Sequence, residues 1–177
     1  MNLHIGSTPW LTRKPILDNL SIIETQWQTC RKCPSGIGAL ATNHVFGRGN
    51  KLARVVFVGE APGKTEDLAG LAFVGRSGKL LNAAIKEAGF KPDHYFFVNT
   101  VACRPCDRAG GPNRVPMDIE TDKCYPRLSS ILASIHPGKI VFLGATAKRW
   151  CELYKPRQGR HYFLHHPAYV LRSGGIG

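Results

Sequence analysis

The sequence predicts an α/β fold built on a mainly parallel sheet. Two observations lead to this prediction. Short apolar runs of strand length recur along the chain, at 54–58, 94–101, 139–144 and 161–172. Segments with the apolar spacing of amphipathic helices separate these runs. Because strands that alternate with helices form crossover units, we expect the strands to lie parallel, with helices packed on the sheet.

The first half of the chain supplies two expected helices and two strands. Residues 16–29 form the first helix, because apolar residues recur at helical spacing at Ile16, Leu20, Ile23 and Trp27. The run "RVVFV" (54–58) is typical of a strand buried on both faces. A second helix is expected within 75–90, where a glycine can end it, and "HYFFVNTV" (94–101) is the next strand.

The second half continues the alternation. A loop rich in Pro, Gly and Arg is expected at 103–116, and a helix at 117–135 that an internal proline could kink. The strand "KIVFLG" (139–144) and a helix at 145–154 follow, and "HYFLHHPAYVLR" (161–172) is expected to be a last strand that leads into a turn. In parallel sheets, functional residues gather at the carboxyl ends of the strands.

Charge gives the first indication of a partner. The 177 residues include 24 Lys and Arg against 12 Asp and Glu, a net charge of +12. Such a surface attracts polyanions, of which nucleic acid is the commonest. The length suits a single domain over 1–177, which we expect to be a monomer. No apolar run approaches the roughly 18 residues of a membrane span, and the amino terminus lacks the apolar region of a signal peptide, so we expect a cytoplasmic protein.

Six cysteines suggest a metal or cluster site, because disulfides are rare in a cytoplasmic protein of this size. Cys30 and Cys33 form a C-x2-C pair after the first helix. One interpretation is a tetrahedral zinc site made with a second such pair, Cys103 and Cys106. The other is an iron–sulfur cluster on Cys30, Cys33, Cys103 and Cys124, which leaves Cys106 spare. The spacing does not separate the two.

Three strand ends carry candidate site residues. After the first strand, the turn "GEAPG" brings Glu60 and the backbone of Gly59, Ala61 and Gly63 to where a ligand could approach closely. Asn99 is an amide inside an apolar strand and needs hydrogen-bond partners, which the edge of a nucleobase could supply. His166 precedes a proline after the last strand. Phe73 could stack on a base or merely fill the core, and the residues alone favour the core.

The motifs "VVFVGEAPG", "AFVGRSGKLLNAAIKEAG", "VNTVACRP", "IVFLGATA" and "HHPAYVLR" occur in one order across the chain. Together they resemble the family 4 uracil-DNA glycosylases, the iron–sulfur branch of the uracil-DNA glycosylase superfamily, over roughly residues 18–172. The resemblance implies a three-layer α/β/α sandwich around a central four-stranded, mainly parallel sheet. It also implies a [4Fe–4S] cluster that ties the first helix to the "CRP" loop.

The resemblance assigns roles to individual residues. The cluster ligands fall on Cys30, Cys33, Cys103 and Cys124, and "CDRAGGP" then resembles an insertion that carries Cys106. The catalytic residues fall on Glu60 and His166, the base-stacking aromatic on Phe73 and the uracil-reading amide on Asn99. Glu60 would either position water or stabilise the sugar cation.

The implied activity is hydrolysis of the N-glycosidic bond of uracil in DNA, which starts base-excision repair. Divergence in the loops indicates a bacterial, archaeal or viral member, whose substrate could be another modified base. One alternative is a catalytically silent nucleic-acid-binding module with the same fold. Another is an α/β protein of different function that carries a zinc ribbon.

Overall fold

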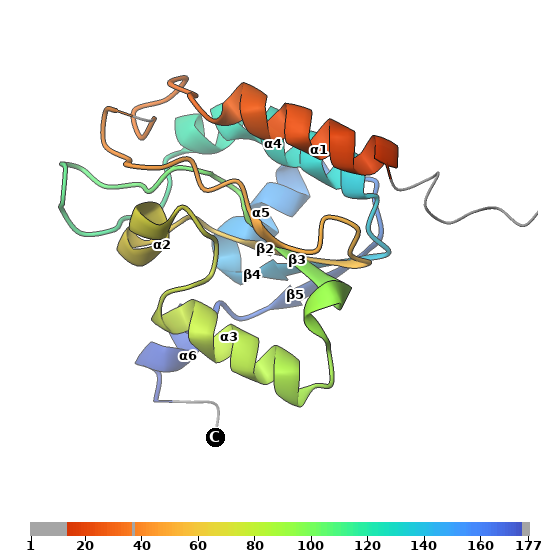
Figure 1. The fold of residues 1–177 in the computed structure, drawn as a ribbon. Helices are drawn as coiled ribbons and strands as arrows, with labels where there is room; N and C mark the ends of the chain where they lie inside the picture. The colour runs from red at the N-terminus through yellow and green to blue at the C-terminus, as the bar shows by residue number, and fades with distance from the viewer. Residues whose placement is uncertain (1–13, 37, 175–177) are drawn as a thin grey trace, which may run out of the picture.

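A five-stranded sheet lies between two layers of helices in the computed structural model, which describes residues 14–36 and 38–174 (Figure 1). The strands are β1 (Arg48–Gly49), β2 (Val55–Gly59), β3 (Tyr95–Asn99), β4 (Lys139–Leu143) and β5 (Arg160–Leu164). The helices are α1 (Lys14–Trp27), α2 (Lys64–Ala69), α3 (Arg76–Glu87), the 3-10 turn η1 (Pro92–His94), α4 (Asp118–Ile135), α5 (Gly144–Tyr154) and α6 (Pro167–Arg172).

The strand order is β1-β3-β2-β4-β5, and β2 to β5 run parallel. α1 and α4 lie side by side over one face of the sheet, and α3 and α6 lie on the other face (Figure 1). The predicted α/β fold with a mainly parallel sheet is therefore confirmed. The sheet has one strand more than expected, because the two residues of β1 pair antiparallel with the edge of β3.

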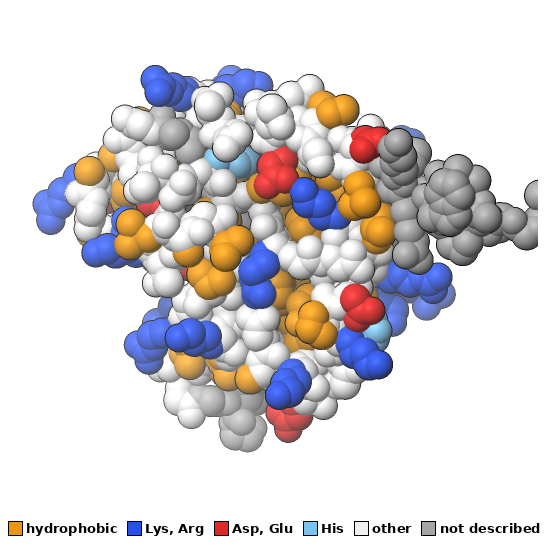
Figure 2. Space-filling view, in the orientation of Figure 1, with side chains coloured by type: hydrophobic (Ala, Val, Ile, Leu, Met, Phe, Trp, Pro, Cys, Tyr) orange, Lys and Arg blue, Asp and Glu red, His pale blue; other side chains and the backbone are white. Residues whose placement is uncertain are grey.

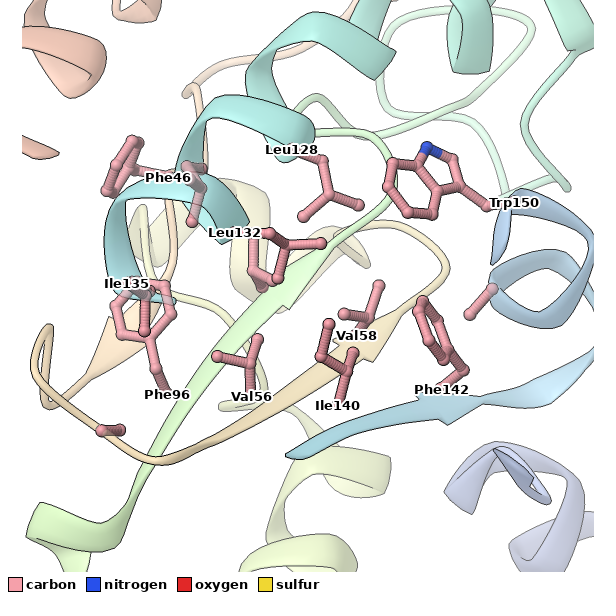
Figure 3. Packing of buried hydrophobic residues seen from close by; sticks show 14 of the residues in the cluster. Phe46, Val56, Val58, Phe96, Leu128, Leu132, Ile135, Ile140, Phe142 and Trp150 are labelled. Carbon is pink, nitrogen blue, oxygen red and sulfur yellow. The ribbon is translucent and has the colours of Figure 1, made fainter. Parts of the chain in front are cut away.

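The apolar core divides between the two faces because successive strand residues point in opposite directions. Val56, Phe96 and Ile140 face the layer of α1, α4 and α5, where Leu132 and Trp150 meet them (Figure 3). The alternate strand residues face α3 and pack on its buried side chains. Truncating one fully buried leucine of such a core typically costs about 2–5 kcal/mol.

The end of the last strand differs from the prediction. β5 stops at Leu164, and Pro167–Arg172 form helix α6 instead of more strand. Pro167 occupies the first helical turn, where a missing N–H costs nothing, and the side chain of His166 caps the helix. The strand predicted over 165–172 was wrong, because the apolar residues after Pro167 carry a helical turn.

Two smaller differences concern helices. α2 was not predicted, because six residues are too few to show an apolar stripe. Pro126 was expected to kink or break the helix before β4, but α4 is continuous over its 18 residues. No helix in the described part of the chain is long and apolar enough to cross a membrane.

Candidate active site

A cavity of about 960 Å³ opens at the carboxyl ends of the parallel strands. Its lining includes all four of the side chains predicted to act together, Glu60, Phe73, Asn99 and His166. The predicted backbone contacts Ala61 and Gly63 also line it. The sheet therefore brings to one place residues that are up to 106 positions apart in the chain (60 to 166).

Asn99 is the last residue of β3 and is only 3% exposed. Its backbone oxygen accepts a hydrogen bond from Arg127 Nη2 at 2.5 Å, whereas its side-chain amide makes no hydrogen bond within residues 14–36 and 38–174. A buried amide needs partners, so this one is available to a ligand in the cavity.

Gly59 pairs with Asn99 across the β2–β3 ladder. A Cβ atom at Gly59 would lie 2.5 Å from both Asn99 Oδ1 and Phe73 Cζ, closer than real Cβ contacts allow. The glycine predicted for close approach is thus required by the site's own side chains: it makes room for the amide and the ring.

Phe73 occupies a left-handed backbone conformation with φ 56°, which is unfavourable for a side chain of this size. Its ring is 6% exposed, lies 5.0 Å from the Phe97 ring and contributes to the cavity wall. Arg48 holds the turn, because it donates to Ala72 O at 2.7 Å and to Phe73 O at 3.2 Å. Both readings of Phe73 therefore apply: it packs on the core and presents an aromatic surface to the cavity.

Glu66 is a functional neighbour that the sequence reasoning missed. This buried carboxylate on α2 accepts hydrogen bonds from the backbone N–H groups of Val74 (3.1 Å) and Gly75 (2.7 Å). It thereby fixes the turn directly after Phe73. An acidic residue in a short, unpredicted helix gives no sequence signal for this task.

Glu60 is anchored by residues from two other elements. Thr146, on α5, donates to Glu60 Oε2 at 2.5 Å. Thr100 donates its amide to Gly59 O at 2.9 Å and its hydroxyl to Glu60 O at 2.6 Å. Neither threonine was predicted as a site residue, although Thr100 directly follows Asn99, which was.

His166 is held in one orientation by the start of α6. The amide of Ala168 donates to His166 Nδ1 at 3.1 Å. Burial lowers the pKa of His166 below the ordinary value, and the nearby Glu60 carboxylate offsets this only in part. The ring is therefore neutral near pH 7, and because Nδ1 accepts a hydrogen bond, its proton is on Nε2. His166 can act as a neutral donor.

The four thiols proposed as cluster ligands influence one another electrostatically. Burial, together with the nearby thiols of Cys124, Cys33 and Cys30, raises the pKa of Cys103 to about 12. Burial also raises the pKa of Cys33, with contributions from Cys124 and Cys30. Cys106 is fully buried and does not contribute to either shift.

Within the described ranges, no three His, Cys, Asp or Glu side chains lie close enough together to hold a single metal ion. A compact tetrahedral site needs sulfur atoms about 2.3 Å from one ion, whereas a cluster of four irons holds its thiolates further apart. Cys30 and Cys33 follow α1, Cys103 follows β3 and Cys124 lies on α4, and four thiols are the donor type that an iron–sulfur cluster takes.

The surroundings of the cavity are basic. Lys64, Arg76, Arg114 and Arg172 contribute to its lining. Lys and Arg side chains are spread over the face shown in Figure 2, with few Asp and Glu between them. An aromatic surface, a free amide, a neutral imidazole donor and a carboxylate under a cationic mouth define a site for a planar heterocycle attached to a polyanion.

The fold and this site thus define the class of α/β proteins that carry a functional cavity at the carboxyl edge of a parallel sheet. A family model described as "Uracil DNA glycosylase superfamily" matches residues 46–175. The chain belongs to the uracil-DNA glycosylase superfamily, and its curated relatives carry the name type-4 uracil-DNA glycosylase.

Three relatives show the extent of the similarity. The protein from Archaeoglobus fulgidus is 39% identical over 76% of this chain and 64% of its own length. The protein from Thermotoga maritima is 38% identical over 77% of this chain and 66% of its own. The protein from Pyrobaculum aerophilum is 34% identical over 84% and 83%. The chain thus spans just under two thirds of the first two relatives.

Proposed function

We propose that this chain is a uracil-DNA glycosylase that hydrolyses the N-glycosidic bond of uracil in DNA and so starts base-excision repair. The observation that carries the proposal is the unpartnered amide of Asn99, buried beside Phe73 and His166 in one cavity. The names of the relatives, from archaea and a bacterium, support the same activity. A microbial origin and, given six free thiols, a cytoplasmic setting agree with it.

The target bond lies inside a duplex, so the nucleotide must first be turned out of the stack into the cavity. Phe73 would stack on the extruded base. The Asn99 amide would donate to a uracil carbonyl and accept from its ring N–H, which gives partners to a side-chain amide that makes no hydrogen bond within residues 14–36 and 38–174. The basic residues at the mouth would contact the flanking phosphates.

When the bond between C1′ and N1 breaks, its electron pair stays on the base and the sugar gains cationic character. His166 Nε2–H would donate to uracil O2 as negative charge builds there, and as a neutral donor it need not lose its proton. Water then bonds to C1′ and releases a proton. Glu60, with one oxygen held by Thr146, would direct that water or stabilise the cation with the other oxygen.

We propose that Cys30, Cys33, Cys103 and Cys124 hold a [4Fe–4S] cluster. When bound, the cluster would act as a cross-link that joins the end of α1, the loop after β3 and α4. These three segments carry the four proposed ligands. The thiols of Cys30, Cys33 and Cys124 all affect the pKa of Cys103. The zinc alternative requires Cys106, whose thiol does not contribute to the pKa shifts of Cys103 or Cys33.

The activity is tested by release of free uracil from single- and double-stranded oligonucleotides. We expect release by the wild-type chain and a loss of about 100- to 1000-fold in rate for His166→Ala, the usual effect of removing one such donor. His94→Ala is the matched control, because His94 lies at the amino-terminal end of β3. No release of uracil by a chain with an intact cluster would favour a silent or re-targeted binding module, and a panel with hypoxanthine and oxidised bases would identify a different substrate.

The cofactor is tested by absorption. A bound cluster gives a broad band near about 400 nm, whereas zinc thiolates are colourless. Cys124→Ala should lose the band and Cys106→Ala should keep it. The reverse result would exclude our ligand set.

A further inference from the structure

Arg127 is a fully buried arginine on α4. Its Nη1 donates to Phe46 O at 3.2 Å and its Nη2 to Asn99 O at 2.5 Å, while its Nε is buried without a partner. No carboxylate forms an ion pair with it within the described residues. A buried charge without a counter-charge is costly, so this guanidinium needs a source of negative charge nearby.

The surroundings of Arg127 contain the proposed cluster ligands. Cys124 is three residues earlier on α4, so the two side chains share a face of the helix. Cys124 also packs against Val101 and Ala102, the two residues directly before Cys103, so the region around Arg127 includes a second proposed ligand segment. The positive charge of Arg127 reaches His44, whose pKa burial and Arg127 together lower to about 3, so His44 is neutral and adds no second cation.

Arg104, directly after Cys103, is also buried, at 4% exposure, and it is bonded elsewhere. Its Nε donates to Asn113 Oδ1 at 2.6 Å, and its Nη2 donates to Gly111 O. Both partners belong to the loop between β3 and α4. Arg127 differs because its hydrogen bonds end on the strand residue that carries the free amide.

The charges of the two groups are complementary. Cluster ligands are thiolates, and four thiolates would leave a [4Fe–4S] cluster with net negative charge. The buried guanidinium of Arg127 belongs to a residue one helical turn from Cys124, a proposed ligand. One cation thus lies near a cluster ligand in the helix and also bonds the backbone of the base-reading residue.

We propose that Arg127 is a positioning residue that serves as the buried counter-charge of the cluster and, through the carbonyl of Asn99, fixes the amide that reads uracil. The inference rests on the proposed function, because it needs both the cluster and the uracil pocket. The inference gives the cluster a second role beside cross-linking. The negative charge of the cluster would offset the free-energy cost of burying the Arg127 cation, which orients the site.

Two substitutions separate the properties of the guanidinium. Arg127→Lys keeps the positive charge but loses the two guanidinium nitrogens that donate to the carbonyls of Phe46 and Asn99. Arg127→Gln removes the charge and keeps one amide donor. Arg149→Gln is the control, because Arg149 is exposed and paired with Asp118. For each purified, cluster-loaded chain we would measure the midpoint potential of the cluster, kcat and KM for a uracil oligonucleotide, and affinity for an abasic-site analogue.

We expect Arg127→Lys to keep the wild-type potential and to raise KM for uracil DNA about tenfold, the effect of losing one charge-assisted hydrogen bond. Its affinity for abasic-site DNA should not change, because no base is read there. Arg127→Gln should lower the potential, since removing a nearby positive charge disfavours reduction. Should Arg127→Gln not fold, the KM and abasic-site results of Arg127→Lys decide.

Wild-type potential and KM in both variants would overturn the inference. An equal loss of uracil and abasic-site binding in Arg127→Lys would also overturn it, because the effect would then be general. A wild-type chain that lacks the cluster or uracil release would instead refute the proposed function itself, which the unmodified protein reveals before any variant is made.

Discussion

The cavity has two walls that are held in place by different forces. The sheet wall includes Glu60 and Asn99, at the ends of β2 and β3, and Gly59 pairs with Asn99 on the ladder. The ladder between these strands and the apolar core beneath them fix its backbone. The loop wall consists of Phe73 and the pocket-lining segment 113–115, and both follow irregular chain.

Buried polar side chains hold the loop wall. Glu66 and Arg48 fix the Phe73 turn. Glu120, 1% exposed, accepts two hydrogen bonds from Arg114, each 2.8 Å long, and one from Ser35. The sheet wall should therefore be sensitive to volume and the loop wall to single polar substitutions. The following predictions test that contrast.

The largest effect is expected in the sheet wall from Gly59→Ala. The added Cβ would overlap Asn99 Oδ1 and the Phe73 ring, so the amide and the aromatic surface could not both keep their places. We expect kcat/KM for uracil release to fall by about 100-fold or more, as for loss of a preorganised donor. Gly138→Ala is the control, because its nearest neighbour would be Arg54 O at 3.8 Å. A normal rate for Gly59→Ala would show that the wall tolerates volume.

In the loop wall, Arg114→Met should lower the free energy of unfolding by about 2–3 kcal/mol, because it leaves the buried Glu120 without its main partner. Burial alone would raise the pKa of Glu120, but bonds from Arg114, Ser35 and Met117 lower it below the ordinary 4.5. The ion pair thus stabilises the fold above about pH 4.5, and the benefit is lost as the pH falls further.

Chemical denaturation at several pH values measures this change in the free energy of unfolding. The wild-type chain and Arg114→Met should differ most at neutral pH and converge below pH 4.5. Arg149→Met removes an exposed pair with Asp118 and should change stability by less than about 1 kcal/mol. A difference that persisted unchanged at low pH would mean that packing, not charge, holds this part of the loop wall.

A smaller effect is expected from Glu66→Gln, which keeps an oxygen acceptor but removes the charge that strengthens the bonds to Val74 and Gly75. We expect KM for uracil DNA to rise several-fold with kcat nearly unchanged, because the stacking surface shifts while the donor does not. Steady-state kinetics separate the two parameters. A fall in kcat alone would place Glu66 in the chemical step.

The smallest effect is expected from raising the pH. His166 has a pKa below the ordinary 6.5 and donates from its neutral ring, so it stays neutral as the pH rises from 7.5 to 8.5. Single-turnover rates should be flat over that range. If the ring acted as a cation instead, the rate would fall about tenfold for each pH unit above its pKa.

The two walls also differ in how far the sequence predicts them. Glu60 and Asn99 could be predicted because apolar runs locate the strands, and the ends of parallel strands meet at one edge. Glu66, Arg48 and Thr146 could not, because each acts on a residue that is close only after folding. The sequence does not show whether a polar residue in a loop faces water or a buried carbonyl.

The helix after His166 is another element that the sequence did not predict. A run of apolar residues after β5 suggested more strand, whereas one proline and the capping imidazole start α6. The resemblance to known glycosylases identified His166, but only the geometry shows which ring nitrogen is free to donate. The catalytic and ligand roles of these residues stay predictions until they are measured.

The bond from the Ala168 amide to His166 makes one imidazole serve both as the cap of a helix and as the donor of the site. The first turn of α6 therefore fixes the orientation of the His166 ring. Loosening that turn by a substitution within Pro167–Arg172 would let the ring swivel while the sheet stayed intact. A substitution that disrupts this short helix would therefore abolish the activity before the protein unfolded.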